Sequence, residues 1–77
     1  MAKFPAAVYR DIVKVAKKTS FYFCHQAKGS HEIWRRDSDG KRTTIPNHGS
    51  KILKRKTLKA ILEDMRITSE EFIRLKK

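Results

Sequence analysis

Three histidines, His25, His31 and His48, are the residues of this 77-residue chain best suited to proton transfer near neutral pH. An imidazole has an ordinary pKa of about 6.5, so it can both accept and donate a proton in that range. His31 lies two residues after Gly29, and His48 lies in a loop of turn-forming residues. Spacing alone does not choose between the three, and each stays open as a catalytic candidate or an ordinary polar residue.

Other chemistries have weaker support in the sequence. The single Cys24 cannot form an internal disulfide, and with three scattered histidines it lacks the paired spacing of a zinc site. The chain has neither a G-x-S-x-G nucleophile motif nor a G-x-x-x-x-G-K-[ST] phosphate loop. We therefore expect no metal, no cofactor and no small-molecule ligand, and we interpret Cys24 as a half-buried strand residue.

The charge points to a polyanionic partner. The chain has 19 Lys and Arg against 8 Asp and Glu, a formal net charge of +11, and residues 40–62 contain no acidic residue. No basic helix has the Trp- and Phe-rich face that inserts into a membrane, and no apolar run reaches the length of a signal peptide or a membrane span. We expect a cytoplasmic protein that does not bind membranes.

Residue periodicity predicts the elements that must position these groups. Apolar residues at helical spacing predict helices over 5–18, with Pro5 in the first turn, and over 57–66, with Thr57 as N-cap. Thr68 and Glu71 fit a capping box that begins a helix over 69–76. Strands are predicted over 20–26, 30–36 and 41–45, with turns at Lys28-Gly29 and Asp37–Gly40.

The resulting order, α-β-β-β-α-α, predicts one α+β domain over residues 1–77, a three-stranded antiparallel sheet with helices on one face. Strand alternation places His31, Ile33 and Arg35 on one face of the sheet. Glu32 and Trp34 belong to the other face, so the Glu32 carboxylate should point away from His31.

A histidine among cations suits RNA cleavage, because it can take the proton of a 2′-hydroxyl that attacks the adjacent phosphate while a lysine or arginine stabilises the added charge. Such a step requires no metal. Two alternatives stay open. One is a non-catalytic RNA-binding module, favoured by the basic cluster GSKILKRKTLK at the start of a helix, and the other is a domain whose charge serves an acidic protein partner.

Three motifs resemble a known family. They are Gly29-Ser30-His31, Ile45-Pro46-x-His48 and Thr57-Leu58-x-x-Ile61-Leu62, and over about residues 8–75 the chain resembles the HicA-type mRNA interferase toxins of bacterial toxin–antitoxin pairs. The resemblance implies a fold like the double-stranded-RNA-binding domain, endoribonuclease cleavage of mRNA and inhibition by a HicB-type antitoxin. One departure is Ser20, where the family usually has a glycine.

The resemblance also implies that His31 is catalytic. Gly29 and Ser30 would shape the approach of the phosphate, with Lys28 as a nearby cation and His48 as a supporting residue. The predicted contacts to the RNA backbone are Lys51, Lys54, Arg55, Lys56 and Lys59.

Overall fold

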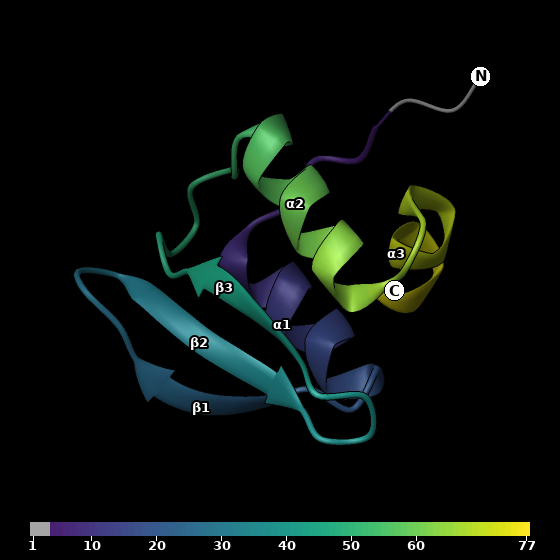
Figure 1. Ribbon diagram of the computed structural model, residues 1–77. Coiled ribbons are helices and arrows are strands. Elements are labelled where there is room, and N and C mark those ends of the chain that lie inside the picture. The colour runs from purple at the N-terminus through teal and green to yellow at the C-terminus, as the bar shows by residue number, and fades with distance from the viewer. Residues whose placement is uncertain (1–3) are drawn as a thin grey trace.

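The computed structural model describes residues 4–77, in which one helix, three strands and two further helices follow one another in the predicted order (Figure 1). The elements are α1 (Tyr9–Lys18), β1 (Tyr22–Gln26), β2 (His31–Arg36), β3 (Lys41–Pro46), α2 (Arg55–Met65) and α3 (Ser69–Leu75). The strands pair antiparallel in the order β1-β2-β3. The predicted α+β fold and its element order are confirmed.

The two faces of the sheet differ in burial as the strand alternation predicted. Glu32 and Trp34 of β2 are buried together with Ile45 of β3, whereas His31 and Arg35 are exposed on the opposite face. All three helices lie on the same side of the sheet in Figure 1. Glu32 therefore points away from His31, and the face that carries His31 is open.

The core forms where the helices meet the covered face of the sheet. The apolar spacing predicted for the first two helices corresponds to the buried residues of α1 and α2, and α3 adds Phe72. The buried hydrophobic residues are Ala7, Ile12, Val15, Ala16, Phe21, Trp34, Ile45, Leu53, Leu58, Ile61, Leu62, Met65 and Phe72. Burial of this kind is the main source of fold stability in a small domain.

Helix α1 begins at Tyr9, so the prediction of a helix from Pro5 is wrong. Val8 is extended and caps the helix, and its amide donates to the Asp11 carboxylate at 3.1 Å. The chain before Val8 runs beside a distant segment instead, where the Ala7 carbonyl accepts a hydrogen bond from the Leu53 amide at 2.9 Å. This long-range pairing holds the segment extended, which local helix signals could not indicate.

Helix α2 also departs from its predicted start. It begins at Arg55, with the extended Lys54 as N-cap and no side-chain cap, so the interpretation of Thr57 as N-cap is wrong. The prediction for α3 is confirmed: the Glu71 amide donates to the Thr68 hydroxyl at 3.1 Å, and the Thr68 amide donates to the Glu71 carboxylate at 3.0 Å.

The connection from α1 to β1 explains why the first strand begins later than predicted. Ser20 has φ 73°, a left-handed conformation that glycine adopts most readily, and the following Phe21 amide donates to the Ala16 carbonyl at 2.9 Å. These features end the helix in a Schellman-like turn, so β1 begins at Tyr22. Ser20 stands where the family usually has glycine, and it adopts the conformation that glycine favours.

Strand β1 is an exposed edge strand in which all five residues are accessible. Its register shifts between Phe23, opposite Trp34, and His25, opposite Ile33, leaving Cys24 at the irregularity. Cys24 is exposed, so its interpretation as half-buried is wrong. Irregular edge strands of this kind are less able to pair with another strand.

Candidate nucleic-acid interface around His31

His31 lies at the first position of β2, where the backbone on both sides is fixed. Its carbonyl accepts a hydrogen bond from the Ala27 amide at 2.7 Å, and its Cα is paired with that of Pro46 in β3. Gly29, in the preceding turn, has φ 66° and its carbonyl accepts a hydrogen bond from the Gln26 side chain at 2.8 Å. The exposed imidazole thus stands on a rigid strand rather than on a free loop.

Two grooves meet at His31. One, the loop groove, has a volume of about 410 Å³ and is lined by His31, Pro46, His48, Lys51, Ile52, Leu53, Lys54 and Thr57. The other, the helix groove, has a volume of about 370 Å³ and is lined by His31, Thr44, Pro46, Lys56, Thr57, Ala60, Ile61 and Asp64. His31, Pro46 and Thr57 line both, so His31 stands at the junction of two recesses.

The loop that carries His48 is fastened to the strand that carries His31 by Asn47. The backbone amide of Asn47 donates to the Ser30 carbonyl at 2.9 Å, and its side-chain oxygen accepts a hydrogen bond from the Gly49 backbone amide at 3.2 Å. The Asn47 amide group also donates to the Glu32 carboxylate at 3.4 Å. Asn47 therefore holds one wall of the loop groove in place, a role that its position among turn formers did not reveal.

Glu32 is a buried polar centre beneath this site. It is 7% exposed and accepts hydrogen bonds from the Tyr9 hydroxyl at 2.7 Å and from the Trp34 indole at 3.1 Å, besides the one from Asn47. Burial of the Tyr9 hydroxyl, together with its bond to Glu32, raises the pKa of Tyr9 to about 12. The carboxylate next to His31 in sequence is thus a structural group of the covered face.

Four of the predicted supporting residues lie in these grooves with His31: His48, Lys51 and Lys54 in the loop groove, and Lys56 in the helix groove. The others are not among the lining residues. Lys28, Gly29 and Ser30 adjoin His31 through the chain, and Lys59 is exposed elsewhere on α2.

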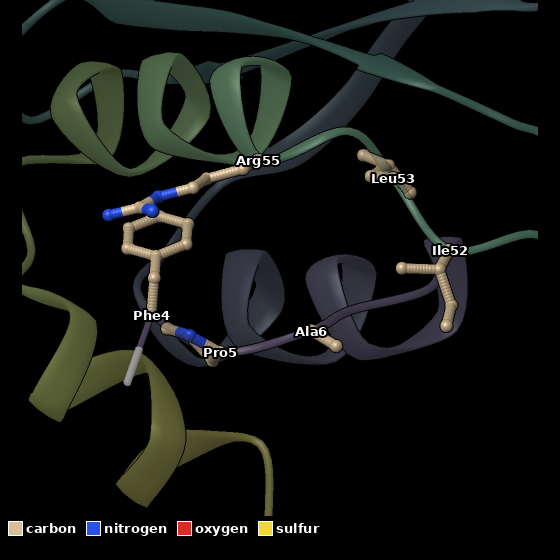
Figure 2. Close-up of a pocket in the computed structure, with 6 residues that line it drawn as sticks. All are labelled: Phe4, Pro5, Ala6, Ile52, Leu53 and Arg55. Carbon is tan, nitrogen blue, oxygen red and sulfur yellow. The ribbon is translucent and has the colours of Figure 1, made fainter. Parts of the chain in front are cut away.

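Arg55 is directed elsewhere. Its guanidinium lies over the Phe4 ring, 5.2 Å from the ring centroid, in a separate pocket that Ile52 and Leu53 also line (Figure 2). This cation–π contact directs the side chain of Arg55 towards the N-terminal segment rather than into either groove at His31. The sequence placed Arg55 in the basic cluster, but its side chain belongs to the contact with the N-terminal segment.

The charge of the two grooves is strongly positive but not uniform. The residues that line the two grooves, all in the described part of the chain, include three lysines and one carboxylate, that of Asp64. Its Oδ2 accepts a hydrogen bond from the Thr43 hydroxyl at 3.0 Å. Sequence reasoning did not place Asp64 or Thr57 among the site residues, because the groove between β3 and α2 exists only once the helix is packed.

Residues 4–77 contain no cluster of three or more His, Cys, Asp or Glu side chains that could hold a metal ion. None of their helices is long and apolar enough to cross a membrane.

Comparison with known families gives the wider context. The family model described as "HicA toxin of bacterial toxin-antitoxin" matches residues 9–67, more than three quarters of the chain. The chain belongs to the HicA toxin family. The HicA match begins with α1 and ends just after α2, so it contains His31 and both grooves, whereas α3 lies beyond it. No curated protein matched the chain.

Membership confirms the resemblance seen in the three motifs. A HicA-family chain is the toxin of a toxin–antitoxin pair, and such a pair includes an antitoxin partner.

Proposed function

We propose that this HicA toxin is an endoribonuclease that cleaves mRNA in the cytoplasm, with His31 as the residue that transfers the proton. The observation that carries the proposal is the position of His31 at the junction of two grooves whose walls supply Lys51, Lys54 and Lys56. The RNA backbone carries one negative charge per phosphate, and lysines along a groove are the usual means of holding it.

In the proposed reaction, the His31 imidazole takes the proton of a ribose 2′-hydroxyl. The 2′-oxygen attacks the adjacent phosphorus and forms a 2′,3′-cyclic phosphate, while the bond to the 5′-oxygen of the next nucleotide breaks. The proton gained by His31 returns to that leaving oxygen, so the imidazole ends as it began. Lysines of the two grooves stabilise the negative charge that develops on the phosphate, and His48 supports this by positioning the loop or a phosphate.

Regulation by a HicB-type antitoxin is part of the proposal. A toxin that cleaves mRNA inhibits translation, so its partner must cover the site or prevent RNA from reaching it. The excess of basic residues, which gives the chain a net charge of +11, suits an acidic protein partner as well as RNA.

The test is cleavage of a defined RNA transcript by the purified protein in the presence of a metal chelator. The wild type is expected to give fragments that end in a 2′,3′-cyclic phosphate. His31→Ala should lower the rate by about 10²–10⁴-fold, the usual contribution of a positioned acid or base. His25→Ala is the matched control, because His25 is exposed on the neighbouring strand and lies outside both grooves.

Two results would contradict the proposal. Full activity of the His31→Ala protein would remove the catalytic role of His31. Tight, salt-sensitive RNA binding by the wild type without any cleavage would instead support the non-catalytic RNA-binding module.

A further inference from the structure

The two grooves at His31 differ in the chemistry they offer to an RNA strand. Among polar side chains, the loop groove has His48, Lys51 and Lys54, which suit phosphate oxygens. The helix groove has one lysine, Lys56, and a carboxylate, Asp64. A carboxylate repels phosphate, so the helix groove is poorly suited to hold the backbone along its whole length.

The walls of the helix groove favour a flat, partly apolar group. Pro46 and Ile61 are buried, and Ala60 adds a small side chain between the two ends of the recess. A volume of about 370 Å³ falls within the range of about 300–1,000 Å³ typical of small-ligand sites. An unstacked nucleobase has the required shape, since single-stranded RNA is recognised through bases that leave the stack.

Asp64 determines which edge of such a base fits. Its Oδ2 is held by the Thr43 hydroxyl at 3.0 Å, and its Oδ1 accepts no hydrogen bond from any residue in 4–77. An ionised carboxylate accepts hydrogen bonds and donates none. The exocyclic amino group of adenine, cytosine or guanine can donate to it. Uracil offers the carboxylate only its N3–H, which lies between two carbonyl oxygens that the carboxylate would repel.

We propose that the helix groove binds the nucleobase next to the cleaved phosphate and that Asp64 selects a base with an exocyclic amino group over uracil. This inference rests on the proposed ribonuclease function, because His31, which would act at the cleaved phosphate, lines the same groove as the proposed base site. Asp64 is thus a specificity residue, and its carboxylate takes no part in proton transfer.

The test uses oligoribonucleotides that differ only in one nucleotide, varied in turn on each side of the mapped cleavage site. At one of the two positions, kcat/KM for the wild type should be about tenfold or more lower with uracil than with an amino-bearing base, the discrimination expected of a specific base contact. In Asp64→Asn the difference should fall to about twofold, because the asparagine amide can donate to a uracil carbonyl and can still accept from Thr43.

The matched control is Glu63→Gln, which removes one negative charge from the neighbouring, exposed position of α2 that does not line the groove. It should leave the base preference unchanged. A second measurement avoids variants altogether: replacing adenosine by purine riboside, which lacks the amino group, should lower kcat/KM of the wild type about tenfold and have no effect in Asp64→Asn.

Failure of this inference is distinguishable from failure of the ribonuclease proposal. Cleavage with equal rates for uracil and the amino-bearing bases, or a preference that Asp64→Asn leaves intact, overturns the role of Asp64 alone. If no RNA is cleaved, the equilibrium affinity of the protein is measured for the same series of oligonucleotides. Each of these carries a 2′-deoxy sugar at the nucleotide whose 2′-hydroxyl would face His31. A base preference lost in Asp64→Asn would then support the groove, and equal affinities would refute it.

Discussion

At the β3 edge of the sheet, the loop groove and the helix groove surround His31 with lysine side chains. At the β1 edge lies a third recess, the aromatic groove, lined by Tyr9, Val13, Lys17, Phe21, Tyr22, Phe23, Glu32 and Trp34. Its volume, about 400 Å³, lies between those of the other two, about 370 and 410 Å³. Size therefore does not distinguish a candidate site here, and the kind of side chain that lines each recess does.

The difference follows from how each edge is built. Helix α2 packs beside β3, so its Lys56 and Asp64 line a recess together with residues of the strands. Helix α1 borders the recess at β1 with a single lysine, Lys17, and the aromatic side chains of β1 are half exposed, with Phe23 at 49%. Phe23 packs edge-on against Trp34, with the ring centroids 6.1 Å apart. The β3 edge gathers three lysines and two histidines in its two grooves, whereas the aromatic groove contains one lysine and the buried Glu32 carboxylate.

Glu32 connects these two regions, and its removal gives the largest expected change in stability. Its carboxylate joins Tyr9, which lines the aromatic groove, to Asn47, which holds the loop groove. Glu32→Ala leaves the buried Trp34 indole without a partner and should lower the free energy of unfolding by about 3 kcal/mol. Urea denaturation measures this change.

The control for that prediction is Glu63→Ala, an exposed carboxylate of α2, which should change the free energy of unfolding by less than about 0.5 kcal/mol. Glu32→Gln should lower the free energy of unfolding by an amount between those of Glu32→Ala and Glu63→Ala. Its side-chain oxygen can still accept from Tyr9 and Trp34, but its NH2 group would face the NH2 group of Asn47, and both are donors. Equal stability of the Glu32→Ala protein and the wild type would show that the buried network does not join the two edges.

The same network marks the limit of what the sequence could predict. Alternation in β2 placed Glu32 on the face opposite His31 correctly, and the Thr68–Glu71 capping box was recognised from its spacing. The partners of Glu32 come from Tyr9 and Asn47, which lie 23 and 15 residues away. No local pattern encodes which distant donor reaches a buried carboxylate.

The candidate site shows the same division. His31 and the lysines of the loop were identified by motif and charge, whereas the helix groove depends on how α2 packs beside β3. Charge alone also did not indicate that the Arg55 guanidinium stacks on Phe4, outside both grooves (Figure 2). The start of α1 was missed for a related reason, because the pairing of Ala7 with Leu53 joins segments far apart in sequence.

The next prediction compares the cations of the two regions at equal charge. Replacing Lys51, Lys54 and Lys56 by alanine should reduce the salt slope of single-stranded RNA binding by about 2, at about 0.7 per phosphate contact. At 0.1 M salt this corresponds to roughly 100-fold weaker binding. Fluorescence anisotropy of a labelled RNA over a range of salt concentrations measures both quantities.

The charge-matched variant replaces three exposed cations of α1: Arg10, Lys14 and Lys17. It loses the same three charges, so any general attraction between protein and RNA falls equally in both proteins. We expect its salt slope to stay within about 0.5 of the wild type, because screening limits the reach of charges outside the contact to about 10 Å at 0.1 M salt. Equal losses in the two variants would mean that RNA binds without preference for the β3 edge.

The smallest effect concerns the Tyr9 hydroxyl in the aromatic groove. Its pKa is raised to about 12 from an ordinary value of 10.0, chiefly by burial and then by its bond to Glu32. The protonated form is therefore favoured in the folded state. Its contribution to stability should be complete below pH 10 and should be lost as the pH rises from 10 towards 12.

Tyr22 must be removed to observe this titration, because hydrogen bonding to Asp37 also raises the pKa of its exposed hydroxyl. In Tyr22→Phe, the ultraviolet absorbance of the Tyr9 phenolate should appear near pH 12. Lysines titrate in the same range and also change the stability. The free energy of unfolding is therefore measured from pH 9 to 12 for Tyr22→Phe and for Tyr9→Phe/Tyr22→Phe, and the difference between the two variants gives the contribution of Tyr9. A phenolate transition centred at pH 10 would show that the Tyr9 hydroxyl is not hydrogen-bonded to the Glu32 carboxylate in solution. Glu32 would then not link the aromatic groove to the loop groove.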